Sequence, residues 1–171
     1  PEAAPTKFFY PRAGTPNAIV RLMFVAHAGG QPTVPVAWDH QAFPYLTHVT
    51  WPKAGPLTLL VQNREQTDQR LLAVDLATGR TRELLRETDA AWLNLDDNFA
   101  ASSGDRRPPF WLKDGSHFLW TTERRGSWQV ELRDATGKLV RELTPVTWLY
   151  RGLVGLDEAG GSVHVRGGDD S

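Results

Sequence analysis

The sequence contains no cysteine, and only one of its 171 residues is methionine. The absence of cysteine excludes disulfide bonds, thiolate metal ligands and a cysteine nucleophile. No stretch approaches the roughly 20 consecutive apolar residues that a membrane-spanning helix needs, so no membrane insertion is expected. Neither sign of charge is in excess, because 19 basic and 20 acidic residues give a formal net charge of -1. This balance excludes the basic surface typical of nucleic-acid-binding proteins, and no nucleic-acid partner is expected.

The residues that are present describe an ordinary globular chain with an unusual amount of tryptophan. Hydrophobic residues make up 40% of the sequence and charged residues 23%, and there are 7 tryptophans. A chain of this length forms one domain that buries roughly 70% of the surface exposed by its unfolded state. A stable core is therefore expected without disulfides or metals.

Two segments of the chain align with each other at a period of about 60 residues. Each contains a turn that runs from a tryptophan to a glycine, at residues 51–55 and 111–115. Each later contains a Thr-Gly turn, at residues 78–79 and 136–137. Glycine at these positions supplies the positive φ that tight hairpin turns require. The repeat therefore predicts hairpins centred near Gly55, Gly79, Gly115 and Gly137.

Between these turns the apolar residues alternate with polar ones, which is the pattern of β-strands. Leu57, Leu59 and Val61 fall on one face of a strand, and Val130 and Leu132 alternate with polar neighbours in the second unit. Each unit therefore predicts a four-stranded antiparallel meander. Meanders of this length are the blades of β-propellers, which need about four to eight blades to close a ring.

The predicted fold is all-β, a partial β-propeller with about two complete four-stranded antiparallel blades plus two partial blades. We expect residues 1–171 to be a fragment of a propeller domain whose remaining blades lie elsewhere in a longer chain. The only helical structure expected is a turn or two within residues 84–92. The alternative is an independent β-sandwich with a coincidental repeat. The expected blades are a partial one at about 8–40, whole ones at about 45–88 and 108–145, and a partial one at about 146–168.

Several motifs, taken in order, resemble the propeller of dipeptidyl peptidase IV-like serine exopeptidases of the prolyl oligopeptidase clan. Two departures from the family pattern occur. Asn17-Ala18 stands where members often have Asn-Pro, and a polar insertion occupies residues 98–109. The matching motifs lie at residues 10–14, 45–51, 92–97, 111–115 and 119–126.

The resemblance implies a bacterial secreted or periplasmic enzyme that releases N-terminal dipeptides from peptides. Its propeller would gate and position short peptides for an α/β-hydrolase domain carrying Ser, Asp and His. The nucleophile motif G-x-S-x-G does not occur in this sequence, and neither does the adjacent glutamate pair with which the family grips a peptide amino terminus. We therefore expect no catalytic residue and no cofactor in this chain, and no activity from the chain alone. Its expected partners are the missing blades, the hydrolase domain and short peptides.

The best candidate site is the segment from Trp92 to Asp97, which resembles the propeller wall facing the substrate cavity near the second residue of the peptide. Trp92, Asn94 and Asp96 are the residues proposed for this wall. The alternative is a structural crossover between blades in which Asp96 and Asp97 cap turns.

Metal sites and aromatic platforms are weaker readings of the same sequence. The five histidines, at positions 27, 40, 48, 117 and 164, are scattered, so no metal site is expected. Single aspartates at glycine turns, such as Asp75 and Asp134, are expected to cap their own backbone rather than bind calcium. Tryptophans at repeat positions 51, 111 and 120 predict packing between blades, whereas those at 38, 92 and 148 are the candidates for exposed contact.

A different class of function also fits the sequence, namely a non-catalytic propeller scaffold that binds a protein or glycan partner on its rim. A G-x-S-x-G motif in the remainder of the parent sequence would decide for the enzyme. Either way, excised blades expose apolar faces, here expected at Leu22, Phe24, Val163 and Val165. Exposed strand edges and faces predict self-association of the isolated chain.

Overall fold

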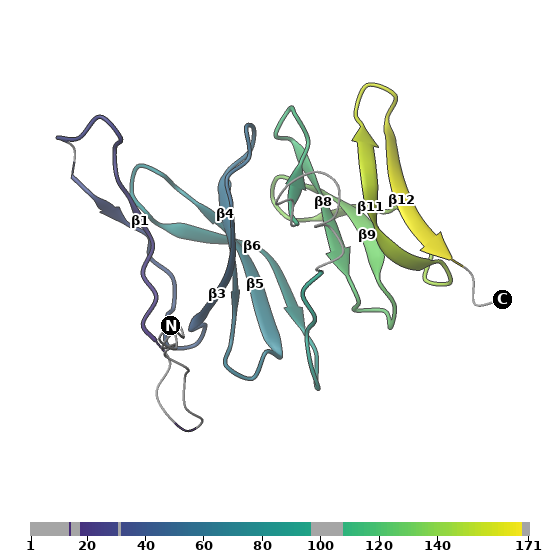
Figure 1. The fold of residues 1–171 in the computed structure, drawn as a ribbon, viewed down its shortest axis with the longest axis horizontal. Coiled ribbons are helices and arrows are strands. Elements are labelled where there is room, and N and C mark those ends of the chain that lie inside the picture. The colour runs from purple at the N-terminus through teal and green to yellow at the C-terminus, as the bar shows by residue number, and fades with distance from the viewer. Residues whose placement is uncertain (1–13, 15–17, 31, 97–107, 169–171) are drawn as a thin grey trace, which may run out of the picture.

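The computed structural model of the chain describes residues 14, 18–30, 32–96 and 108–168. Within these residues there are strands and turns but no helix, and the sheets follow one another across the molecule in sequence order (Figure 1). The motifs and insertion predicted at residues 10–13, 17 and 97–107 lie outside the described part of the chain. The strands are β1 (Met23–Phe24), β2 (Val34–Pro35), β3 (Tyr45–Thr50), β4 (Leu57–Gln62), β5 (Asp68–Val74), β6 (Thr81–Thr88), β7 (Phe110–Trp111), β8 (His117–Thr122), β9 (Gln129–Asp134), β10 (Leu139–Glu142), β11 (Leu149–Asp157) and β12 (Ser162–Gly168).

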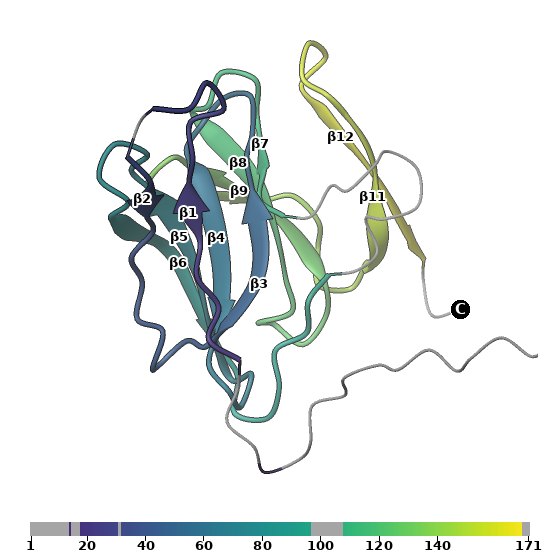
Figure 2. The same ribbon diagram turned by 60° about the vertical axis from the view of Figure 1, so that its left-hand side comes forward.

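Two four-stranded antiparallel meanders form the middle of the molecule, with strand orders β3-β4-β5-β6 and β7-β8-β9-β10. A two-stranded sheet stands at each end, β1-β2 before the first meander and β11-β12 after the second (Figure 2). None of the four sheets closes on itself. The prediction of a partial propeller with two complete and two partial blades is confirmed.

The repeated glycines occupy the hairpin turns as predicted. Gly55, Gly79, Gly115 and Gly137 have φ values of 87°, 71°, 67° and 93°. A side chain is strained in this region of backbone conformation, so glycine is the residue that fits. The repeat in the sequence is thus the repeat of a backbone requirement.

Two of these glycines also bring neighbouring sheets together. A Cβ built on Gly137 would lie 2.5 Å from the carbonyl carbon of Leu84 on β6, and closer still to its oxygen. A Cβ on Gly79 would lie 3.0 Å from the carbonyl carbon of Pro35 on β2, again with the oxygen closer. In both cases the β-turn of one sheet rests on the outer strand of the preceding sheet. The two turns are therefore equivalent contacts between adjacent blades.

Aspartates at the turns cap the backbone, as predicted. Asp75 Oδ1 accepts a hydrogen bond of 2.9 Å from the Ala77 amide, and Asp134 Oδ1 accepts one of 2.9 Å from the Thr136 amide. These bonds lower the pKa of both carboxyl groups; for Asp134 the largest contribution is the Thr136 hydroxyl, and for Asp75 it is the Ala77 amide. Both side chains therefore stabilise turns as carboxylates.

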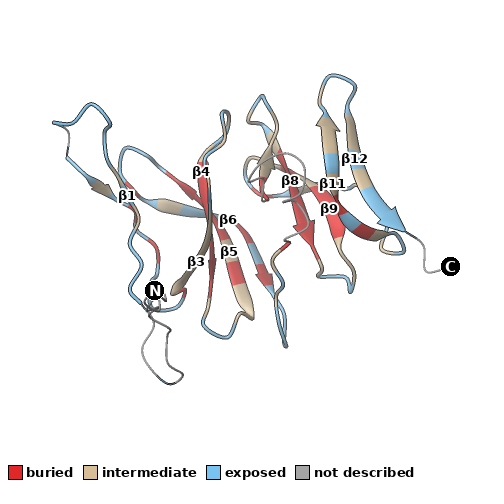
Figure 3. Ribbon diagram, viewed as in Figure 1, coloured by how far each residue is buried: buried red, intermediate tan, exposed pale blue. Residues whose placement is uncertain are grey.

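The hydrophobic core lies between the sheets rather than within any one of them. Along β4, Leu57, Leu59 and Val61 pack toward the first sheet, whereas Leu60 packs with Phe118 of the second meander. A third cluster joins the second meander to β11 and β12. Burial is densest in the two central meanders and falls toward both ends of the molecule (Figure 3). Each sheet thus depends on its neighbours for stability.

Residues 84–92 do not form the expected helical turn. Strand β6 continues to Thr88 because it pairs with β5 over its whole length, with Leu85 opposite Leu71 and Thr88 opposite Asp68. The turn that follows is closed by Asp89, whose Oδ1 accepts hydrogen bonds from the amides of residues 91 and 92. Pairing with the neighbouring strand therefore overrides a helix-compatible local sequence.

Two expectations about tryptophan are revised by packing. Trp38, expected to be exposed, is 9% exposed, and its Nε1 donates a hydrogen bond of 3.1 Å to the Phe43 carbonyl. Trp51, expected in an interface, contacts Phe24 edge-on at 5.8 Å yet remains 66% exposed. The short β1-β2 sheet beside Trp51 covers only part of the ring.

The apolar faces of the end sheets are also arranged differently from the expectation. Leu22 and Phe24 are partly buried against the first meander, and Val163 and Val165 against the second. Other residues of the end sheets carry the exposed apolar surface. Met23 on β1 is 54% exposed, and Val154 on β11 is 61% exposed. Side chains alternate along a strand, so burying one set turns the other toward solvent.

In the part of the chain that the structure describes, no helix is long and apolar enough to cross a membrane.

Candidate functional site

The segment after β6 carries the predicted site and crosses from the first meander to the second. Leu93 donates its amide to the Gln66 carbonyl at 2.8 Å, which ties the crossover to the β4–β5 turn. Asn94 Nδ2 donates a hydrogen bond of 2.6 Å to Glu123 Oε2, on the corner between β8 and β9. The backbone amide of Trp92, followed by that of Ala91, lowers the pKa of Asp89 below its ordinary value, so this carboxyl is charged at neutral pH.

A pocket lies along this crossover between the two meanders, and all three predicted residues, Trp92, Asn94 and Asp96, line it. Trp92 is 57% exposed and Asn94 is exposed, so both side chains are accessible to a ligand. The structure brings the three residues together at one pocket. Their role as a substrate-cavity wall stays a prediction.

Asp96 differs from the other two because it is buried, at 7% exposure. The Tyr150 hydroxyl on β11 donates a hydrogen bond of 3.3 Å to Asp96 Oδ2. Burial, together with the negative charge of Asp96, raises the pKa of Tyr150 well above its ordinary value. Asp96 therefore fastens the crossover to strand β11. The alternative, in which Asp96 caps a turn, stays a prediction.

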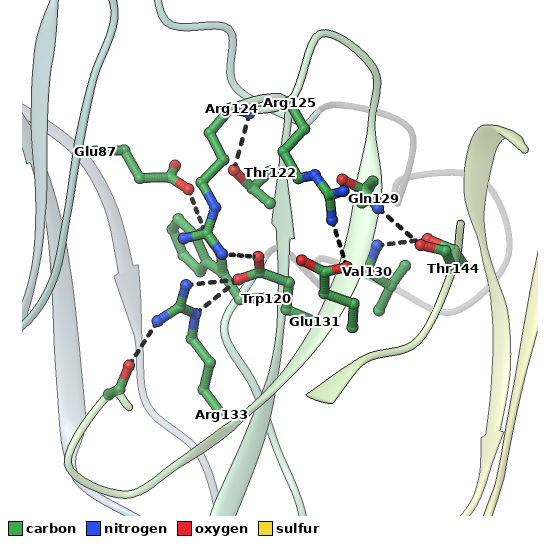
Figure 4. Close-up of polar contacts among 12 residues, drawn as sticks. Glu87, Trp120, Thr122, Arg124, Arg125, Gln129, Val130, Glu131, Arg133 and Thr144 are labelled. Carbon is green, nitrogen blue, oxygen red and sulfur yellow. Dashed lines mark hydrogen bonds and ion pairs between the residues drawn. The ribbon is translucent and has the colours of Figure 1, made fainter. Parts of the chain in front are cut away.

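Glu87 is a polar residue of the pocket that sequence reasoning missed. It is 7% exposed and accepts a hydrogen bond from Gln69 Nε2 at 2.7 Å. Its other oxygen accepts one from Trp120 Nε1 at 3.1 Å (Figure 4). Gln69 is on the first meander and Trp120 on the second, so this carboxylate links the two sheets. Glu87 comes two residues after the buried Leu85 on the same strand, and residues two apart lie on the same face of a strand. This spacing was the signal in the sequence that Glu87 is buried.

A buried ion cluster stands behind the pocket on the second meander. Glu131, at 1% exposure, accepts hydrogen bonds from Arg124 and from Arg133 (Figure 4). The Arg133 Nε bond is 2.8 Å long, and Arg133 Nη1 also donates to the Gly137 carbonyl at 2.7 Å. Arg133 Nη2 lies 2.6 Å from Glu131 but is not aligned for a hydrogen bond. The cluster fixes Arg124, which lines the pocket.

The pocket as a whole is acidic and aromatic. Four carboxylates, those of Glu87, Asp89, Asp96 and Glu123, and one arginine line it, which gives a formal balance of -3 with the histidine counted as neutral. Three tryptophans also lie in its wall. Among the described residues no group of three or more His, Cys, Asp or Glu is placed to hold a metal ion.

The whole chain matches a known protein family. The family model described as "Dipeptidyl peptidase IV (DPP IV) N-terminal region" matches residues 1–171. The chain belongs to the dipeptidyl peptidase IV N-terminal region family. The resemblance seen in the sequence motifs is thereby confirmed.

Solved structures show the same fold as this dipeptidyl peptidase IV N-terminal region. Porphyromonas gingivalis dipeptidyl peptidase 4 superposes with a TM-score of 0.76 at 22% identity, covering 95% of this chain and 22% of that one. A protein from Bacteroides ovatus assigned as a dipeptidyl aminopeptidase IV gives a TM-score of 0.71 at 21% identity, covering 90% of this chain and 23% of that one. The chain therefore spans less than a quarter of the length of these structures.

Proposed function

We propose that this chain is the propeller segment of a dipeptidyl peptidase IV-like serine exopeptidase that releases N-terminal dipeptides. In this role the ring gates access to a hydrolase domain and positions short peptides for it. The observation that carries the proposal is an accessible Trp92 and Asn94 on the wall of an interblade pocket, in a chain of the dipeptidyl peptidase IV N-terminal region family.

The partners in this proposal are further blades and an α/β-hydrolase domain of a longer parent chain. The two end sheets have two strands each among the described residues, whereas the central blades have four. Both end sheets present apolar side chains to solvent, including Met23 and Val154. Further blades would cover these surfaces and complete the sheets.

Within the pocket, Trp92 and Asn94 are proposed to contact the peptide, and Asp96 to hold the crossover in position. Tethering of Asn94 to Glu123 and of Asp96 to Tyr150 supports this division of roles, because each bond fixes the segment to a different blade. A rigid wall orients a bound peptide better than a free loop does.

The isolated chain is proposed to have no hydrolytic activity. Ser127 Oγ donates to the Val146 carbonyl at 2.7 Å, and Ser162 Oγ lies 3.1 Å from His164 Nε2 on the exposed strand β12. Neither serine is part of a G-x-S-x-G turn. Both are therefore surface turn and strand residues in this account.

A chromogenic assay with X-Pro and X-Ala dipeptide substrates tests the proposal. The parent protein should hydrolyse them, whereas the chain alone should give the blank rate. Ser127→Ala and Ser162→Ala should leave both results unchanged. Turnover by the chain alone that disappears with either substitution would contradict the proposed division between propeller and catalytic domain. A parent without dipeptidyl peptidase activity would favour the non-catalytic scaffold.

A further inference from the structure

A carboxylate in the wall of the interblade pocket, that of Glu123, is oriented by a hydrogen bond from the crossover segment. Glu123 accepts the Asn94 side-chain amide on Oε2 at 2.6 Å, and its Oε1 has no hydrogen-bond partner among the described residues. By contrast, Glu87 uses both of its oxygens to bind Gln69 and Trp120. Glu123 and Asp89, whose two backbone bonds are both on Oδ1, are thus the pocket carboxylates that can accept a bond from a ligand. Glu123 is the one of the two that is bonded to the predicted site residue Asn94.

The wall beside Glu123 provides an aromatic face. Trp92 lines the same pocket and is 57% exposed, although a large apolar ring is normally buried. An exposed indole ring attracts a cation placed over its face, and the attraction is strongest for tryptophan. An aromatic face with a nearby carboxylate is a combination that selects positively charged groups over neutral ones.

A buried hydroxyl supplies a second, independent indication of a ligand. Thr121 lines the pocket at 4% exposure, and its Oγ1 has no hydrogen-bond partner within the described part of the chain. Buried polar atoms are nearly always paired in folded proteins. A ligand with several N–H donors would satisfy this oxygen together with Glu123.

We propose that the pocket binds a positively charged nitrogen group, specifically the arginine or lysine side chain of a peptide, between the Trp92 ring and the Glu123 carboxylate. The excess of three carboxylates in the wall attracts the charge, and Asn94 holds Glu123 in the orientation that receives it. The inference rests on the proposed function in taking a peptide as the carrier of that charge.

A side chain fits this site better than a peptide amino terminus does. A guanidinium group is planar, stacks on aromatic rings and donates several hydrogen bonds in a fork, which matches a tryptophan face with acceptors beside it. A terminal ammonium group lacks the planar face and stands directly on the peptide backbone. Arginine is therefore expected to bind more tightly than lysine.

NMR titration of the ¹⁵N-labelled chain with three peptides distinguishes a charged side chain from a charged amino terminus as the bound group. They are acetyl-Ala-Arg-Ala-amide, its citrulline counterpart, and Ala-citrulline-Ala-amide with a free amino terminus. Citrulline has the shape of arginine without the charge. The indole N–H of Trp92 and the side-chain amide of Asn94 report binding at this pocket and not elsewhere.

We expect the arginine peptide to bind at least about tenfold more tightly than the citrulline peptide, because it adds a cation–aromatic and a charge-assisted contact. Glu123→Gln should reduce this preference, since glutamine can still accept the Asn94 bond but carries no charge. Trp92→Leu should weaken it. Glu83→Gln, which removes the same charge from an exposed pair with Arg70 outside the pocket, should leave it unchanged.

Equal affinities for the arginine and citrulline peptides would overturn the inference, and so would a preference that Glu123→Gln leaves undiminished. A free-terminus citrulline peptide that binds as tightly as the arginine peptide would overturn the assignment to a side chain. Failure here is distinct from failure of the proposed function. Hydrolysis of neutral X-Ala substrates by the parent would still stand if the charge preference were absent.

Discussion

Replacement of Gly137 by alanine tests whether neighbouring sheets pack as adjacent propeller blades. Gly137 has a φ of 93° and sits in the β9–β10 turn, pressed against the backbone of Leu84 on the preceding meander. An alanine Cβ would lie 2.5 Å from the Leu84 carbonyl carbon, a distance that side chains do not adopt. The backbone of β6 or the turn must therefore move.

The expected cost has two parts that a second variant separates. Alanine at positive φ costs about 1–2 kcal/mol wherever it occurs. Forcing a backbone contact apart adds about 1–3 kcal/mol, as in overpacked cores. Gly126→Ala carries only the first cost, because Gly126 has a φ of 89° and no atom within 4 Å of its Cβ position.

Urea unfolding followed by tryptophan fluorescence gives both free energies of unfolding by linear extrapolation. We expect Gly126→Ala to lower stability by about 1–2 kcal/mol and Gly137→Ala by about 2–5 kcal/mol. Equal losses for the two variants would refute the claim that this turn is a contact between blades.

Three further predictions follow from buried charges, capped turns and exposed sheets. Glu131→Gln should destabilise the chain by about 3 kcal/mol in the same urea assay, because two arginines lose a buried partner, whereas Glu142→Gln in an exposed pair should cost less than about 1 kcal/mol; equal losses would contradict the cluster. The lowered pKa of Asp134 means that its stabilising effect is present above its ordinary value of 3.8 and is lost as pH falls through the lower folded value. Asp134→Asn should therefore make stability fall less steeply with acid below about pH 3.8, and an unchanged slope would count against the cap. Light scattering over a dilution series should show a mass that rises above 19.1 kDa with concentration, and a fixed monomer mass would exclude self-association.

The regular parts of the fold could be predicted because their requirements are local. A glycine turn needs positive φ, so Gly79 and Gly137 mark the same backbone position in both units. Alternation along residues 57–61 likewise follows from the two faces of a strand. These signals needed no knowledge of the neighbouring blade.

The failures concern residues whose surroundings come from other parts of the chain. Strand β6 extends to Thr88 because it pairs with β5. Trp38 is buried because it packs in the first core cluster, where its Nε1 also donates a hydrogen bond to the Phe43 carbonyl. Buried charges such as Glu131 look like surface residues in a sequence, since charged side chains are seldom buried unless paired. Arg133, two residues later on the same strand face, was a local signal for this pairing, whereas Arg124 reaches Glu131 only across the β8–β9 corner.

The candidate site shows the same division. The segment from Trp92 to Asp96 could be identified from its resemblance to a family motif, and its three chosen residues line one pocket. The partner of Asn94 is 29 positions away, and no local pattern indicates Glu123. Likewise, the tether from Asp96 to Tyr150 depends on how the β11-β12 sheet lies against the second meander.

The central claim, that the interblade pocket serves a dipeptidyl peptidase, is tested most directly by kcat/KM of the parent protein on an X-Pro chromogenic substrate. Trp92→Ala should lower kcat/KM by about tenfold, equivalent to about 1.4 kcal/mol of lost transition-state binding. Trp148→Ala, which removes an exposed tryptophan outside the pocket, should change it by less than about twofold. Equal kcat/KM values for the two variants, with both folded by circular dichroism, would contradict the account.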